Sequence, residues 1–90
     1  MKKFVLFWLK EPYSDDDVKK RKKLINIDDI CLFRESGTPF VPTITLETRH
    51  VGFFAFNKIE HENEVYDCRD LSNVLDALKS IEKKMEKNKQ

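Results

Sequence analysis

The residues with the clearest chemical potential in this sequence are five consecutive cations: Lys19, Lys20, Arg21, Lys22 and Lys23. Such a density of positive charge neutralises several phosphates and gives salt-dependent binding that does not read base sequence. Base contacts would need further residues, and we expect Arg34, Arg49 and Arg69 at strand ends or turns, where side chains reach a groove. The pattern predicts a local DNA-binding patch on a chain of net charge +1. The alternative is a solvated loop whose charge is offset by the acids at 15–17.

A second set of charged residues is acidic and lies later in the chain: Glu60, Glu62, Glu64 and Asp67. The three glutamates alternate, so in a strand they would all face one side, where like charges favour solvent or a cation. An acidic face can also imitate nucleic acid, and a sheet edge can accept a partner's strand. A second function is therefore open: a protein-binding inhibitor or adaptor, of the kind that phages and mobile elements encode. It would act through this acidic face or through an edge strand at residues 40–46.

Cysteine and histidine are the remaining residue types with metal-binding or nucleophilic chemistry. The chain has two of each: Cys31, Cys68, His50 and His61. No two of them have the close spacing that forms a chelating half-site, and neither cysteine stands in a nucleophile motif. The two glycines are too few for a phosphate-binding loop. We therefore predict no metal, no cofactor and no enzymatic activity, because an active site would require a cysteine to meet a histidine in space.

The composition is that of one small domain over residues 1–90. Of the 90 residues, 40% are hydrophobic and seven are phenylalanine, enough apolar side chains to fill one core but not two. The apolar run at residues 4–9 is far shorter than the roughly 20 residues that cross a bilayer, so we expect no membrane contact. Two cysteines are fewer than a secreted scaffold of this size usually carries. These features predict a cytoplasmic protein, of a cell or of a host cell.

Hydrophobic patterning predicts strands in the first third of the chain. The apolar run at 4–9 reads as a buried first strand, and the charged segment at 15–23 as a basic loop or short helical turn. Within 24–33 the phase of the apolar residues shifts at two aspartates. This shift predicts two short strands joined by a kink or bulge, with Ile30 and Leu32 facing inward after it.

The middle of the chain predicts a hairpin. Residues 43–48 and 51–56 both read as strands and are separated by a turn, and Pro42 restricts its own stretch to a sheet edge. Residues 65–68 predict a last short strand. In total we expect about five strands within residues 3–68.

From residue 70 the apolar period changes to 3.6, which predicts a long amphipathic helix at about 70–88 with Asp70 as its N-cap. The apolar side of this helix carries Leu71, Val74, Leu75, Leu78, Ile81 and Met85. This side should pack on the sheet, although Leu78, Ile81 and Met85 are alternatively the contact of a homodimer. The predicted fold class is α+β: a small twisted, mainly antiparallel β-sheet of about five strands packed against one long C-terminal amphipathic helix.

Part of the chain resembles a known family. Residues 24–35 carry a hydrophobic-x-hydrophobic-Asp-Asp-Ile pattern that leads to an aromatic residue and a glutamate, and residues 43–46 and 66–78 continue as a strand and the start of a helix. Over residues 24–78 these patterns resemble the first half of LytTR-type DNA-binding domains; the second half of the family pattern is absent. The resemblance implies a β-rich, sequence-specific transcription regulator that inserts loops into the major groove. It transfers no individual contact residue.

Overall fold

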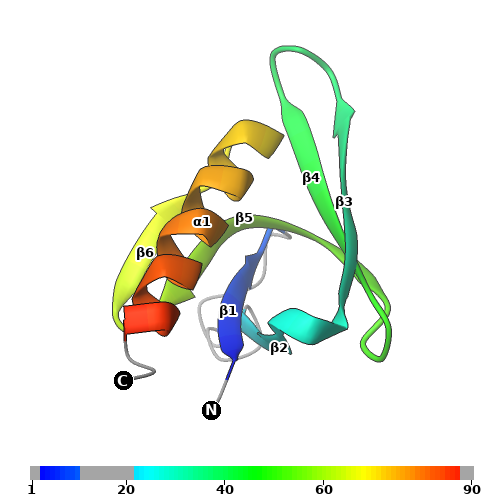
Figure 1. Cartoon of the computed structure of the whole chain (residues 1–90). Coiled ribbons are helices and arrows are strands. Elements are labelled where there is room, and N and C mark those ends of the chain that lie inside the picture. The colour runs from blue at the N-terminus through cyan, green and yellow to red at the C-terminus, as the bar shows by residue number, and fades with distance from the viewer. Residues whose placement is uncertain (1–2, 11–21, 88–90) are drawn as a thin grey trace, which may run out of the picture.

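The computed structural model describes residues 3–10 and 22–87 (Figure 1). These residues form the elements β1 (Phe4–Leu9), β2 (Lys22–Asn26), the 3-10 helix η2 (Ile27–Asp29), β3 (Ile30–Gly37), β4 (Pro42–Thr48), β5 (Phe53–His61), β6 (Glu64–Asp67) and α1 (Leu71–Lys87). All pairings of the strands are antiparallel. The predicted α+β class, with a small antiparallel sheet and one C-terminal helix, is confirmed.

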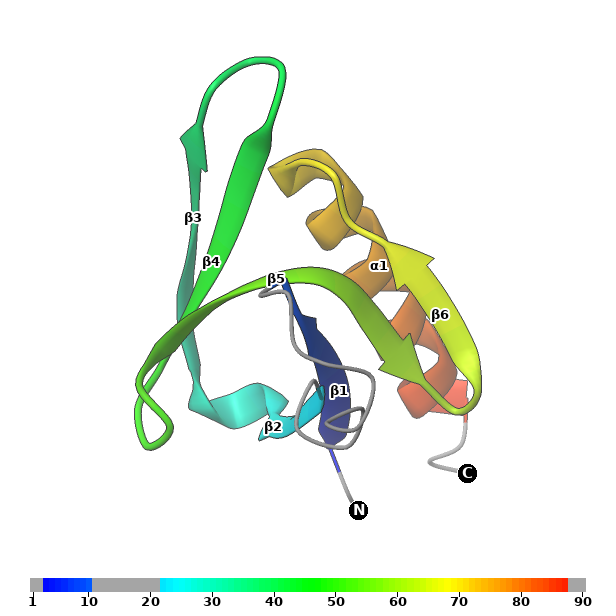
Figure 2. The ribbon, with the colours of Figure 1, turned by 180° about the vertical axis from the view of Figure 1, so that it is seen from behind.

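β5 organises the sheet because it pairs with three other strands. The strand order is β2-β1-β5-β4-β3, and β6 pairs with β5 in addition. The first half of β5, from Phe53 to Phe56, pairs with β4, and its second half pairs with β1 and β6. β5 curves between these halves, so β3 and β4 rise beside the rest of the sheet (Figures 1 and 2). We call β3, β4 and the connecting residues 38–41 the hairpin arm.

The 3-10 helix η2 joins β2 and β3, which are the two ends of that strand order. The side chain of Asn26 accepts a 2.8 Å hydrogen bond from the main-chain N–H of Asp28 and thereby starts the turn. The kink predicted at the two aspartates is therefore confirmed. The basic loop predicted at 15–23 ends earlier than expected, because Lys22 and Lys23 already pair with β1. Positions 15–21 lie outside the described residues.

The inward face of β3 differs from the expectation at one position. Ile30 packs against the core as predicted, but Leu32 is exposed and Phe33 faces the core instead. The ring of Phe33 lies 6.5 Å from that of Phe7 and 5.9 Å from that of Phe56. The cause is a register shift between Ile30 and Leu32, since an extra residue in one strand reverses the alternation of faces.

The prediction of an edge strand at residues 40–46 is also wrong, because β4 lies between β3 and β5. The hairpin predicted from β4 and β5 is confirmed. Pro42 is tolerated because it is the first residue of β4 and pairs with β3 only, at Gly37, while β5 begins to pair at Ile44. The edges of the sheet belong to other strands, and β3 is one of them.

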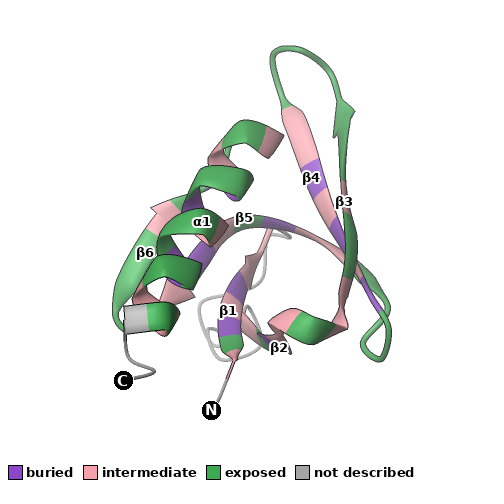
Figure 3. Ribbon diagram, in the orientation of Figure 1, coloured by how far each residue is buried: buried purple, intermediate pink, exposed green. Residues whose placement is uncertain are grey.

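The core lies between the sheet and α1. Its buried side chains come from the inner faces of β1, β2, β4 and β5, from α1, and from Cys68 between β6 and α1: Val5, Phe7, Ile25, Ile44, Leu46, Phe56, Ile59, Cys68, Val74, Ala77 and Ile81. Four phenylalanine rings, Phe7, Phe33, Phe54 and Phe56, form three edge-to-face pairs, a favoured aromatic geometry. Figure 3 shows the buried positions gathered on the inner strands while β3 stays exposed.

α1 begins and packs largely as its pattern predicts. Asp70 accepts a 2.9 Å hydrogen bond from the main-chain N–H of Asn73, which confirms the N-cap. Of the predicted apolar stripe, Leu75 is the exception: it is 49% exposed, and Ala77 takes a place in the core. Leu78, Ile81 and Met85, the residues of the homodimer alternative, all pack against the chain's own core. Among the described residues, no helix has both the length and the apolar character that spanning a membrane requires.

Candidate binding surface

The tip of the hairpin arm is the most exposed apolar feature of the described residues. The side chain of Phe40 is 94% exposed and that of Val41 is 61% exposed. Both lie in the connection between β3 and β4, away from α1 and from the rest of the sheet (Figures 1 and 3). Because this aromatic ring stays in water, folding gains no free energy from burying it. Burial of the ring can therefore still contribute to binding a partner.

The tip is held in a fixed shape by glycine and by local hydrogen bonds. Gly37 has φ +90°, and a Cβ built on it would lie 2.5 Å from the carbonyl oxygen of Val41, so no other residue fits there. The main-chain N–H of Val41 donates to the carbonyl and to the hydroxyl of Thr38, at 3.1 and 3.0 Å. Phe40 is therefore presented on a constrained turn.

Lys10, which directly follows β1, contacts the base of this turn. The ammonium of Lys10 donates to the carbonyl oxygen of Pro42 at 3.1 Å and to the hydroxyl of Thr43 at 3.0 Å. These contacts satisfy the carbonyl at the start of β4, beyond the reach of β5. The arm is therefore tied to the rest of the sheet below its tip.

The outer face of the arm carries an open hollow of about 640 Å³. Its lining residues are Arg34, Glu35, Ser36, Thr45, Glu47 and Phe53. Phe53 is 77% exposed and gives this face a second aromatic ring. Neither Arg34 nor Glu47 forms an ion pair with another residue of the described part of the chain.

The structure separates the two described residues of the predicted basic patch. Lys22 lies on the outer face, where its ammonium is 4.2 Å from the centre of the Trp8 ring and 3.6 Å from a carboxylate oxygen of Glu60. Lys23 is the next residue along β2, so it points to the other face, where its ammonium is 5.7 Å from the centre of the Phe54 ring. Lys19, Lys20 and Arg21 lie outside the described residues.

The three predicted arginines come from separate parts of the fold. Arg34 is inside β3 rather than at a strand end, and it pairs with Thr45 of β4. Arg49 is in the turn between β4 and β5, and Arg69 precedes α1. All three side chains are exposed, and the fold does not gather them with Lys22.

The acidic segment is divided as well. Glu60 lies on the outer face and accepts a 3.1 Å hydrogen bond from the indole of Trp8. The chain then turns at Glu62 and Asn63, which have φ of 49° and 68°, and Glu64 pairs with His61 on the opposite face. Asp67 is the last residue of β6 and is exposed. The carboxylates therefore do not form the single face that alternation along one strand implies.

Glu64 belongs to a network with the helix. Its carboxylate forms an ion pair with Lys84 and accepts a 2.9 Å hydrogen bond from the Tyr66 hydroxyl. The hydrogen bond from Lys84 is the main cause that lowers the pKa of Glu64, and the same contact raises the pKa of Lys84. This carboxylate is already paired with a cation of the chain's own helix.

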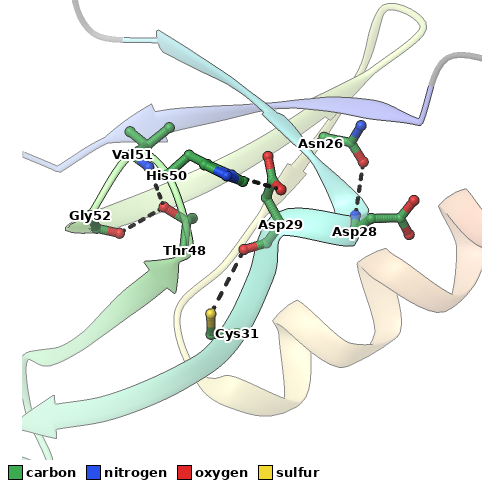
Figure 4. A network of polar contacts seen from close by, with 8 residues as sticks. All are labelled: Asn26, Asp28, Asp29, Cys31, Thr48, His50, Val51 and Gly52. Atoms are coloured by element: carbon green, nitrogen blue, oxygen red, sulfur yellow. Dashed lines mark hydrogen bonds and ion pairs between the residues drawn. The ribbon is translucent and has the colours of Figure 1, made fainter.

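One histidine meets an aspartate near the 3-10 helix, as Figure 4 shows. The Nδ1 of His50 lies 3.1 Å from a carboxylate oxygen of Asp29, whose main-chain carbonyl accepts a 2.9 Å hydrogen bond from the main-chain N–H of Arg49. The thiol of Cys31 donates to that same carbonyl at 3.9 Å and not to the imidazole. The arrangement ties η2 to the turn between β4 and β5, and it lacks the contact between nucleophile and base that covalent catalysis needs.

The other cysteine is part of the core. Cys68 is 4% exposed, and burial raises the pKa of its thiol to about 11. Within the described residues no three His, Cys, Asp or Glu side chains form a group able to hold a metal ion.

Sequence reasoning missed the tip of the arm. The signal was an aromatic residue followed by valine between Pro39 and Pro42, in a segment where a turn normally carries polar residues. Reading residues 40–46 as one strand assigned Phe40 to the sheet and removed it from the surface.

Comparison with known protein families, with curated proteins and with solved structures finds no match to this chain. The LytTR resemblance therefore stays a prediction from short residue patterns, and any function for this fold is argued from its own surfaces.

Proposed function

We propose that this chain is a small non-enzymatic binding protein that engages a protein partner through the tip of the hairpin arm. The observation that carries the proposal is the 94% exposure of Phe40 on a constrained turn. Aromatic anchors that enter a partner's pocket supply a large share of interface energy, and a turn already fixed loses little entropy on binding. The inhibitor or adaptor function is retained, but its contact becomes the exposed turn at Phe40 and Val41 in place of the acidic face or an edge strand at residues 40–46.

A protein fits this tip better than nucleic acid does. Phe40 and Val41 are both apolar and have prolines on either side, so the tip itself offers no cation to a phosphate. A hydrophobic pocket on a folded protein is the complementary surface. DNA binding through the basic run is the competing function, and its described members, Lys22 and Lys23, point to opposite faces.

The test is site-specific photocrosslinking in the cells that produce the protein. A benzophenone amino acid is placed at position 40, and the matched control carries it at position 75, where Leu75 is 49% exposed on α1. We expect a discrete crosslinked product at position 40 only. Excess unlabelled wild-type protein should compete for the partner and suppress the crosslink. The concentration of Phe40→Ser needed for the same suppression should be at least about 30-fold higher, because losing one anchor costs about 2 kcal/mol of binding free energy. Equal background at both positions would refute the proposal.

A second measurement distinguishes DNA binding from protein binding at the tip. Wild type, Phe40→Ser and a Lys22→Gln, Lys23→Gln double variant are titrated with mixed-sequence duplex DNA at two salt concentrations. If the tip is the functional surface, no salt-dependent binding is expected in any of them. Binding that weakens with salt, is lost in the lysine variant and is unchanged in Phe40→Ser would favour the DNA regulator instead.

A further inference from the structure

β3 is an end strand whose outer edge has no strand partner among the described residues. It spans eight residues, and none of them is fully buried. Natural edge strands are usually protected by charged side chains, above all lysine, by proline or by short length; β3 has no lysine and no proline, and its charged residues are Arg34 and Glu35. Its bulge lies at its start, between Ile30 and Leu32, so the stretch from Leu32 to Gly37 pairs regularly with β4. In Figures 1 and 2 β3 forms the outer side of the hairpin arm.

The hydrogen bonds of β4 show which groups of β3 face this edge. The main-chain N–H of Thr48 donates toward β5, to Gly52, and that of Arg49 donates toward β3, to Asp29. Since these directions alternate along a strand, Thr45 bonds toward β3 and meets its register partner Arg34. The main-chain groups of Phe33, Glu35 and Gly37 therefore point to the open edge.

The outward side chains next to this edge carry complementary charges. Arg34 is exposed, and its guanidinium forms no ion pair with any described residue. Glu47 of β4 lies opposite Leu32 and is likewise without an ion pair in the part of the chain described here. Within one copy these two charges are diagonal neighbours, and each is free to meet its opposite across a new strand pairing.

These charges disfavour two ways for two copies to pair and favour a third. An antiparallel pair centred on Arg34 would place arginine directly opposite arginine, and one centred on Glu35 would place glutamate opposite glutamate, both of which repel. A pair centred on Phe33 places Arg34 opposite Leu32 of the second copy. Glu47 of the second copy is then two strand spacings away, about 9.5 Å, which extended arginine and glutamate side chains span together.

We infer that the chain forms a two-fold symmetric dimer in which β3 pairs antiparallel with β3 of a second copy, centred on Phe33, with Arg34 of each copy bound to Glu47 of the other. The contact is isologous and continues the sheet through both copies. It is small, so we expect a weak dimer, with dissociation in the range of roughly 10–500 μM. The inference does not depend on the proposed function of Phe40, because the tip lies outside the paired segment and the two tips would point to opposite ends of the dimer.

The test is sedimentation of the full chain over a concentration series from about 5 μM to 1 mM, a range that brackets the expected weak contact. Reductant is present because Cys31 is exposed. The variants are Arg34→Glu, Glu47→Arg and the double charge exchange, with Ser36→Ala as a control on the same face. Circular dichroism confirms that each variant is folded. A single charge reversal should weaken dimerisation at least about tenfold, and the exchange should restore it to within about threefold, because opposite charges again meet across the pair.

Four outcomes would overturn the inference. One is a monomer at every concentration. Another is a dimer that the single reversals leave unchanged, which would place the contact elsewhere. A third is weakening by the single variants without recovery in the exchange, which would show that the register is wrong. The last is that the chain stays monomeric and instead binds an extended peptide of another protein, which would make β3 a site for a different partner.

Discussion

The carboxylate of Glu35 in β3 accepts a 2.7 Å hydrogen bond from the main-chain N–H of Leu71, the first residue of α1. The two residues are 36 positions apart. One of the N–H groups that a helix start leaves without a partner is thereby satisfied from the hairpin arm, and a negative charge stands at the positive end of the helix dipole. This contact links the arm to the helix.

Glu35→Ala should lower the free energy of unfolding by about 1 kcal/mol, the usual value of a capping contact. Glu35→Gln should lose less, because the amide oxygen can still accept the hydrogen bond while the charge is gone. Urea unfolding followed by circular dichroism measures both. Ser36→Ala, on the opposite face, is the control and should change stability by less than about 0.5 kcal/mol. Equal stability of Glu35→Ala and wild type would show that the contact does not support the helix in solution.

Gly37→Ala should be more destabilising than Gly52→Ala, although both glycines have a φ close to +90°. At Gly52 a Cβ meets nothing within 4 Å, so only the backbone conformation is penalised, by about 1 kcal/mol. At Gly37 the same penalty adds to a collision with the Val41 carbonyl, and we expect about 3 kcal/mol in total. Thermal unfolding of the two variants checks the order. A smaller effect at Gly37 would contradict a constrained tip.

The helix stripe predicts a large difference between two apolar residues of α1. Ile81 is fully buried and Leu75 is 49% exposed. Ile81→Ala should lower the free energy of unfolding by about 3 kcal/mol, through lost burial and the cavity left behind, and Leu75→Ala by less than about 0.5 kcal/mol. Chemical denaturation with matched variants tests this. Similar losses for the two would mean that α1 packs with a different face.

The two cysteines should differ in their reaction with iodoacetamide at pH 8. Cys31 is exposed, whereas Cys68 is 4% exposed and the pKa of its thiol is raised to about 11, mainly by burial. Since the thiolate is the reactive form, we expect one equivalent to react rapidly, at Cys31, and Cys68 to react only after denaturation. Mass spectrometry of peptides identifies the modified residue. Rapid modification of both thiols in the folded chain would refute the burial of Cys68.

Burial of Cys68 also predicts a direction for stability at high pH. An unfolded thiol ionises near its ordinary value of 9.0, while the folded pKa of Cys68 is about 11. The unfolded state therefore loses a proton first, and the contribution of this group to stability, complete below pH 9.0, is lost as the pH rises through the folded value. Cys68→Ala removes this part of the decline, which is measured by comparing the two chains from pH 8 to pH 11.

The network of Glu64 and Lys84 predicts a pH-dependent coupling. Because the pKa of Glu64 is lowered in the folded chain, this group stabilises the fold above pH 4.5, its ordinary pKa. That stabilisation is lost as the pH falls through the folded pKa. Because the pKa of Lys84 is raised in the folded chain, this group stabilises the fold below pH 10.5, its ordinary pKa. That stabilisation is lost as the pH rises through the folded pKa. A double-mutant cycle with Glu64→Gln and Lys84→Gln should show coupling at pH 7, reduced by salt, and none at pH 2. Coupling that persists at pH 2 would rule out the ion pair as its source.

Local sequence determined the elements of this fold where a pattern runs through neighbouring residues. The apolar run of β1, the phase shift at Asp28 and Asp29, the alternation of β4 and the 3.6 period of α1 each identify an element, because a side chain's direction follows from the residues beside it. The same reasoning identified Asp70 as the helix cap, a contact within four residues.

Tertiary structure alone decided which of these elements meet. The order that places β4 inside the sheet and β3 at its edge depends on pairing between strands that are far apart in the sequence. The bulge that turns Phe33 inward in place of Leu32, and the turn at Glu62 that sends Glu60 and Glu64 to opposite faces, depend on the register of paired strands. Pairing of this kind is set by the burial of the whole core and not by local preference. For the same reason the exposure of Phe40 became visible only once the arm that carries it was in place.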